Sequence, residues 1–92
     1  MNGNSGKTAL VTGASSGIGR ASSEALARAG FTVFGTSRRK LSNSPNGVTM
    51  LVCDVTDGEA IAALVSTIHS QTGRIDLLVN NAGVGLLGGG PR

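Results

Sequence analysis

The fold of this chain is decided by an octet near its N-terminus, Thr12-Gly13-Ala14-Ser15-Ser16-Gly17-Ile18-Gly19. The octet follows a short apolar stretch, residues 8–11, that is typical of a buried strand. Apolar residues then recur at helical spacing, at Ile18, Ala21, Ala25 and Ala29. Its glycines permit backbone angles that a side chain forbids, and they let an anion and a helix approach closely. The octet predicts a strand-to-helix turn that binds phosphate on unpaired helix N–H groups; the alternative is a tight turn without a ligand.

The rest of the sequence predicts further strands and helices in alternation. Strands are expected at 31–36, 48–55 and 75–80, and the first helix at 16–28. The second helix is expected to begin at a capping box, Thr56 to Glu59, and to end at Gly73, with its core-facing side formed by Ile61, Leu64, Val65 and Ile68. Strand-helix-strand units of this length give parallel strands with right-handed crossovers, so the expected strand order is 3-2-1-4.

Composition and charge narrow the class of protein. Ninety-two residues are enough for one domain, and the net charge of +3 is concentrated in a single basic cluster, residues 38–40. The chain has no Trp or Tyr on which bases could stack, so we expect no nucleic-acid partner. Cys53 is the only cysteine and His69 the only histidine; we expect a buried thiol and a surface imidazole, with no metal site. No apolar run reaches the length of a membrane helix, which predicts no membrane partner and a cytoplasmic location.

Several motifs together resemble the short-chain dehydrogenase/reductase family. The octet has the spacing Thr-Gly-x-x-x-Gly-x-Gly, and Asn80-Asn81-Ala82-Gly83 follows in the family's order. The resemblance runs from about Lys7 to about Leu87, so residues 1–6 are interpreted as a flexible leader and residues 88–92 as a glycine-rich tail. It implies half of a Rossmann doubly wound α/β fold, with a parallel sheet of about four strands, and hydride transfer between a nicotinamide cofactor and a carbonyl or alcohol substrate.

Cofactor preference is predicted from the end of the second strand. An NAD-preferring site has an acidic residue there, but this chain has Thr36 and Ser37, followed directly by Arg38 and Arg39. A guanidinium can hold a phosphate through two parallel hydrogen bonds, which favours the 2′-phosphate of NADP over NAD. The resemblance assigns this role to Arg38. The alternative is a solvated basic loop.

Other cofactor contacts are implied by the resemblance. Asp54 and Val55 match the family's adenine site, although Asp54 could equally cap the end of its strand beside Thr56. In the family, the backbone at Ala82 and Gly83 lies along the adenosine ribose. The complete set of expected cofactor-binding residues is Gly13, Ser15, Ser16, Gly17, Ile18, Gly19, Ser37, Arg38, Arg39, Asp54, Val55, Asn81, Ala82 and Gly83.

No catalytic residue can be assigned. The family's catalytic tyrosine, lysine, serine and asparagine lie beyond the fourth strand, and this sequence contains no tyrosine. We therefore expect the 92 residues of this chain alone to lack reductase activity. The absent half would also supply the strand beside residues 77–79, so that apolar edge is expected to self-associate or to bind a partner segment. The alternative functions are a non-catalytic nucleotide-binding fragment and a module that captures a partner strand.

Overall fold

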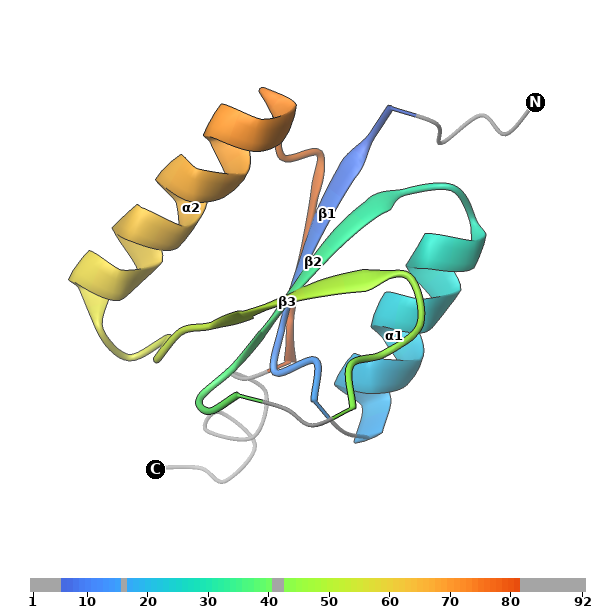
Figure 1. The fold of residues 1–92 in the computed structure, drawn as a ribbon, viewed down its shortest axis with the longest axis horizontal. Coiled ribbons are helices and arrows are strands. Elements are labelled where there is room, and N and C mark those ends of the chain that lie inside the picture. The colour runs from blue at the N-terminus through green and yellow to red at the C-terminus, as the bar shows by residue number, and fades with distance from the viewer. Residues whose placement is uncertain (1–5, 16, 41–42, 82–92) are drawn as a thin grey trace.

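The chain folds into a parallel sheet between two helices (Figure 1). A computed structural model describes residues 6–15, 17–40 and 43–81. Within these residues the elements are β1 (Thr8–Thr12), α1 (Gly17–Arg28), β2 (Thr32–Ser37), β3 (Val48–Val52), α2 (Gly58–Thr72) and β4 (Leu77–Asn80). The strand order is β3-β2-β1-β4, with every pair parallel, as predicted. The expected leader, except for Gly6, and the expected tail lie outside the described residues.

Strand β1 lies at the centre of the sheet and supplies side chains to both faces. Ala9 and Val11 point to the face covered by α1, whereas Leu10 points to the face covered by α2. Figure 1 shows the two helices on opposite sides of the sheet. All five residues of β1 are buried, which explains why its sequence is a continuous short run rather than an alternating one.

Two small hydrophobic cores result from this arrangement. The core under α1 consists of Ala9, Val11, Ala14, Val33 and Val48, with Leu26 and Ala27 of the helix packed against it. The core under α2 consists of Leu10, Phe34, Cys53, Leu64 and Ile68. Each core therefore packs one helix against the middle of the sheet.

The predicted apolar side of α1 was wrong. Ile18 is 76% exposed, and Ala21 and Ala25 are exposed as well. The buried positions are Gly19 and Ser23, whose small size lets the helix approach the sheet. The Ser23 hydroxyl donates to the Arg20 carbonyl at 2.8 Å, so burial leaves no unsatisfied hydroxyl. The spacing of apolar residues did not identify this side, because the residues buried on it, Gly19 and Ser23, are small and not strongly apolar.

The predicted capping box of α2 was also wrong in its residues. The N-cap is Asp57, whose Oδ1 accepts from the Glu59 N–H at 3.0 Å and the Ala60 N–H at 3.4 Å. The Thr56 hydroxyl donates to Asp54 Oδ1 at 2.6 Å, and the Glu59 N–H that a capping box would pair with Thr56 is bonded to Asp57 instead. The predicted end at Gly73 is confirmed, since Gly73 has φ +80° and donates to the His69 carbonyl.

The predicted core-facing side of α2 and the bounds of three strands differ moderately from expectation. Leu64 and Ile68 are buried, but Val65 is 39% exposed. The third strand ends at Val52 rather than Val55, because Val52 pairs with Ser37, the last residue of β2. The fourth strand begins at Leu77 rather than at residue 75, opposite Ala9 of β1. The second strand lies one residue later than expected.

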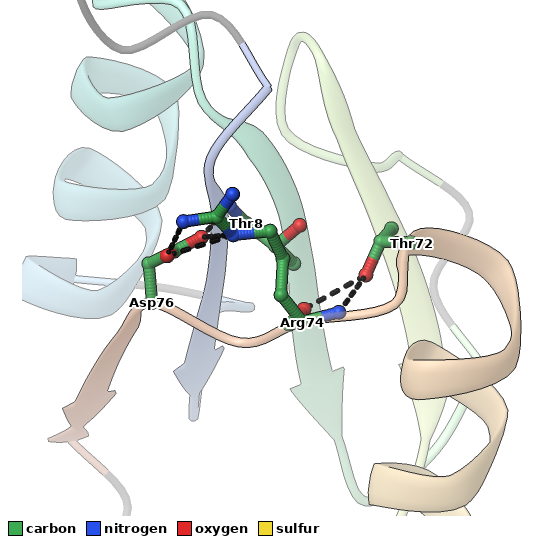
Figure 2. A network of polar contacts seen from close by, with 4 residues as sticks. All are labelled: Thr8, Thr72, Arg74 and Asp76. Atoms are coloured by element: carbon green, nitrogen blue, oxygen red, sulfur yellow. Dashed lines mark hydrogen bonds and ion pairs between the residues drawn. The ribbon is translucent and has the colours of Figure 1, made fainter.

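A polar network fixes the start of β4 against the start of β1 (Figure 2). Asp76 Oδ2 accepts from the Thr8 N–H at 2.7 Å, and the Arg74 guanidinium holds both oxygens of the Asp76 carboxylate. The Thr72 hydroxyl donates to the Arg74 carbonyl at 2.8 Å. These contacts lower the pKa of Asp76, the Arg74 hydrogen bonds most and the Thr8 N–H next. The network lies at the amino-terminal end of the strands, opposite the glycine-rich turn.

Neither helix in the part of the chain that the structure describes is long and apolar enough to cross a membrane.

Candidate functional site

A cleft of about 300 Å³ lies at the carboxyl-terminal end of the central strands. Parallel strands bring these ends to one edge of the sheet, and the reversal of strand order between β1 and β4 is where open α/β sheets bind ligands. The cleft receives residues from three separate loops: those after β1, β2 and β3. Its lining residues are Gly13, Ser15, Thr36, Ser37, Arg38, Cys53, Asp54, Val55 and Thr56. Six of the fourteen expected cofactor-binding residues are thus brought together: Gly13, Ser15, Ser37, Arg38, Asp54 and Val55.

The glycine-rich turn forms one wall of the cleft and requires glycine at three positions. Gly13 and Gly17 have φ of +65° and +61°, angles that side chains rarely adopt. A Cβ on Gly19 would lie 2.0 Å from the Gly13 carbonyl oxygen, so only glycine allows α1 this close to the turn. A Cβ on Gly17 would meet nothing within 4 Å. The backbone there faces open space, which leaves room for an anion at the start of the helix.

The turn after β2 presents Arg38 to the cleft. Ser37 is buried, and its hydroxyl donates to the Arg39 carbonyl, which fixes the path of the chain around Arg38. The Ser37 carbonyl accepts from the Cys53 N–H at 2.9 Å, so this turn is also tied to the end of β3. Arg38 and Arg39 are both exposed, but only Arg38 lines the cleft. The two arginines are therefore not equivalent, and the guanidinium of Arg38 is the one placed to bind an anionic group.

Asp54 lies opposite Arg38 at the end of β3. Its Oδ1 accepts from the Thr56 N–H at 2.9 Å and from the Thr56 hydroxyl at 2.6 Å. These hydrogen bonds lower the pKa of Asp54, and the positive charge of Arg38 lowers it further. The carboxylate is thus ionised and held in one orientation. Both contacts end on Oδ1, which leaves Oδ2 with acceptor capacity for an amino group. The expected strand-end role of Asp54 is present, and it is compatible with a ligand contact.

Three cleft residues were not predicted as site residues: Thr36, Cys53 and Thr56. Cys53 is buried as expected, and burial, with the charges of Asp54 and Asp57, raises the pKa of its thiol. Thr36 is only 1% exposed. No sequence motif includes these three residues. Each is adjacent in the sequence to a predicted site residue, and this adjacency is the signal that could have identified it.

The other expected residues that the structure describes do not line the cleft. Gly17, Ile18 and Gly19 form the first turn of α1, next to the cleft residue Ser15. Asn81 follows β4, and among the described residues its buried Nδ2 has no hydrogen-bond partner. The neighbouring Asn80 accepts from the Thr12 hydroxyl at 2.9 Å, which joins the ends of β4 and β1. Ser16, Ala82 and Gly83 lie outside the described residues.

Comparison with known proteins agrees with this geometry. The family model described as short chain dehydrogenase matches residues 7–91. The chain belongs to the short-chain dehydrogenase family. Among curated relatives of this family, it is 47% identical over 79 residues to a 3-ketodihydrosphingosine reductase of Bacteroides thetaiotaomicron, a match that covers 86% of this chain and 29% of the relative. It is 46% identical over 88 residues to the 3-oxoacyl-acyl-carrier-protein reductase FabG of Vibrio harveyi, with 86% of this chain and 35% of the relative covered.

Solved structures of short-chain dehydrogenases share the fold. A metagenomic short-chain oxidoreductase in complex with NADP matches with a TM-score of 0.70 and 31% identity, over 80% of this chain and 38% of that one. The similarity confirms the Rossmann-type sheet order that the sequence predicted. The chain spans only about a third of the length of the curated relatives.

Proposed function

We propose that this chain is the NADP-binding, N-terminal part of a short-chain reductase, in which hydride passes between NADP and a carbonyl or alcohol carbon. The observation that carries the proposal is the single cleft shared by Gly13, Ser15, Arg38 and Asp54. The glycine turn would hold the pyrophosphate, Arg38 the 2′-phosphate, and Asp54 with Val55 the adenine. Names of relatives support the reaction class, since two are reductases, and one related structure contains NADP.

The preference for NADP rests on the contrast between Arg38 and the residues before it. Thr36 and Ser37 are buried and uncharged, so no carboxylate stands where it would repel a 2′-phosphate. The nearest acidic group in the cleft is Asp54, which is already compensated by Thr56 and Arg38. We propose that the cofactor-binding residues are those expected from the sequence, with Arg38 as the one that discriminates between NADP and NAD.

Catalysis is proposed to need residues beyond this sequence. A tyrosine hydroxyl supplies the proton in the family reaction, and these 92 residues contain no tyrosine. We propose that the chain alone binds cofactor without reducing a substrate. A single cysteine, buried and reduced, is consistent with the expected cytoplasmic location.

The test is a calorimetric titration of the purified chain with NADP and, separately, with NAD. We expect saturable binding that favours NADP. Arg38→Ala should weaken NADP binding by about 1.5–3 kcal/mol, or roughly tenfold to a hundredfold, and leave NAD nearly unchanged. Arg28→Ala is the matched control, because it removes the same charge from the exposed, carboxyl-terminal end of α1, away from the cleft.

Each outcome of the titration has a distinct meaning. Equal losses for both cofactors in Arg38→Ala would refute the assignment of Arg38 to the 2′-phosphate. Equal losses of NADP affinity in Arg38→Ala and Arg28→Ala would show that the affinity depends on the net charge of the chain and not on the position of Arg38. A chain with a folded far-ultraviolet circular dichroism spectrum that binds neither cofactor would refute the proposed function.

We propose, second, that another β-strand pairs with the edge strand β4. β4 lies at the edge of the four described strands, with Leu78 60% exposed and Leu77 37% exposed. Such an edge favours the addition of another strand, from a second copy of this chain or from a following segment. Sedimentation velocity tests this: we expect concentration-dependent association that Leu78→Lys abolishes. A monomer at all concentrations would contradict self-association.

A further inference from the structure

We propose that Thr36 is the residue that positions the glycine-rich turn, and that it links the turn to the strand that precedes Arg38. This inference rests on the proposed function and adds to it a residue that no motif identifies. Thr36 lies at the penultimate position of β2 and is 1% exposed. Its side chain and its backbone both contact the turn.

Two hydrogen bonds carry the inference. The Thr36 hydroxyl accepts from the Gly13 N–H at 3.2 Å, and the Thr36 carbonyl accepts from the Ala14 N–H at 2.9 Å. Successive amides of the turn are therefore held by one residue of the neighbouring strand. Held in this way, the turn leads to the N-terminus of α1 at Gly17, where a phosphate would be bound.

The packing around Thr36 makes the contact specific. A Cβ on Gly35 would lie 2.7 Å from the Ala14 Cβ and 2.8 Å from the Met50 Sδ, so the turn rests directly on the backbone of β2. On the other side of Thr36, the Ser37 carbonyl is held by the Cys53 N–H. The position of Thr36 is thus fixed from both neighbours. Its hydroxyl is the only part of this contact that a substitution can remove while the backbone bond to Ala14 remains.

Thr36 differs in its expected effect from Arg38. The pyrophosphate is common to NADP and NAD, so displacement of the glycine turn weakens both cofactors by the same factor. Arg38 faces the group that only NADP has. Thr36→Val keeps the side-chain volume but leaves the Gly13 N–H without an acceptor, whereas Thr36→Ser keeps the hydroxyl.

The experiment combines calorimetry with amide hydrogen exchange measured by NMR on the 92-residue chain. We expect Thr36→Val to weaken NADP and NAD equally, by about fivefold to thirtyfold, and Thr36→Ser to retain most of the affinity. All titrations are made well below each variant's melting temperature, so that the folded fraction is the same. In the absence of cofactor, the Gly13 amide should exchange at least about tenfold faster in Thr36→Val. The Ala14 amide, bonded to the Thr36 carbonyl, is the internal control.

The possible results separate the two proposals. Unchanged affinity in Thr36→Val, a loss confined to NADP, or no rescue by Thr36→Ser would overturn the role of Thr36. If Thr36→Val does not fold, the wild-type chain still decides: a Gly13 amide that exchanges as fast as an exposed amide would also overturn it. Absence of binding to the folded wild-type chain would instead refute the proposed function, while the Gly13 exchange would still report on the contact.

Discussion

Replacement of Gly19 by alanine tests whether the helix must lie against the glycine-rich turn. A Cβ at this position would be 2.0 Å from the Gly13 carbonyl oxygen, 2.9 Å from the Gly13 carbonyl carbon and 3.3 Å from the Ala14 Cα. All three atoms belong to the backbone, so no side-chain rotation relieves the contact. The start of α1 must therefore move away from β1, or the turn must move into the cleft.

The size of the effect follows from two opposing terms. Overpacking in a close-packed interior costs about 1–3 kcal/mol, and a contact with backbone at this distance belongs at the upper end. Alanine within a helix stabilises by up to about 1 kcal/mol relative to glycine. We expect Gly19→Ala to lower the free energy of unfolding by about 2 kcal/mol, which for a domain of this size corresponds to a fall in melting temperature of roughly 8–16 °C.

Urea denaturation followed by far-ultraviolet circular dichroism measures this loss, since the chain has no Trp or Tyr for fluorescence. Gly58→Ala is the matched control: Gly58 begins α2, and a Cβ there would meet nothing within 4 Å. The control should be neutral or slightly more stable than the wild type. If Gly19→Ala and Gly58→Ala denature at the same urea concentration, the close approach of α1 to the turn is refuted.

Two further predictions concern the helix cap and the polar network. Asp57→Ala should lower the free energy of unfolding by about 0.5–2 kcal/mol through loss of the α2 cap; Thr56→Ala, which leaves that cap intact, should cost less in the same urea experiment, and the reverse order would restore the capping box. Because Arg74 and the Thr8 N–H lower the folded-state pKa of Asp76, the stability from this carboxylate is complete above its ordinary value of 3.8 and is lost as the pH falls through the lower, folded-state pKa. Acid denaturation should therefore be less steep in Asp76→Asn than in the wild type, and equal steepness would contradict the network's contribution.

The overall architecture could be predicted because the signals that determine it are local. The apolar run before Gly13 and the glycine spacing predict β1, the turn and α1, and the alternation of elements then restricts the sheet to the order observed. The structure requires glycine at positions of the turn that the sequence singled out, since Gly13 has φ +65° and a Cβ at Gly19 would collide with the Gly13 carbonyl. The role of Gly17 toward an anion stays a prediction.

Predictions failed where two residues compete for one role. Thr56 and Asp57 are both good N-cap residues, and α2 begins at Gly58, one residue later than a Thr56 cap requires, so Asp57 accepts the first N–H groups of the helix. The apolar side of α1 failed for a related reason. Burial there depends on how closely the helix approaches the sheet, and that approach is set by Gly19 and Ser23, which contribute little apolar area.

Several residues of the candidate site could be predicted from the sequence, but the hydrogen bonds that connect them could not. Gly13, Arg38 and Asp54 were each identified from their own stretch of sequence, and the parallel sheet brings them to one cleft. The link between them, Thr36, is a hydrogen-bond acceptor for the turn, and a sequence motif does not record which strand residue meets a given amide. Its role is visible only in the register between β1 and β2.

The contact between Thr36 and the turn affects how much conformational entropy the turn would lose when a cofactor binds. The Gly13–Ala14 segment is enclosed on two sides, by α1 and by β2: a Cβ added at Gly19 would lie 2.0 Å from the Gly13 carbonyl oxygen, and one added at Gly35 would lie 2.7 Å from the Ala14 Cβ. Thr36 fixes its two amides in addition. If this turn binds the pyrophosphate as proposed, we expect it to lose little conformational entropy on binding, so that the affinity depends on preorganisation more than on the number of contacts. Substitutions that loosen the enclosure should therefore weaken NADP and NAD together, whereas only Arg38, which lies outside it, should separate them.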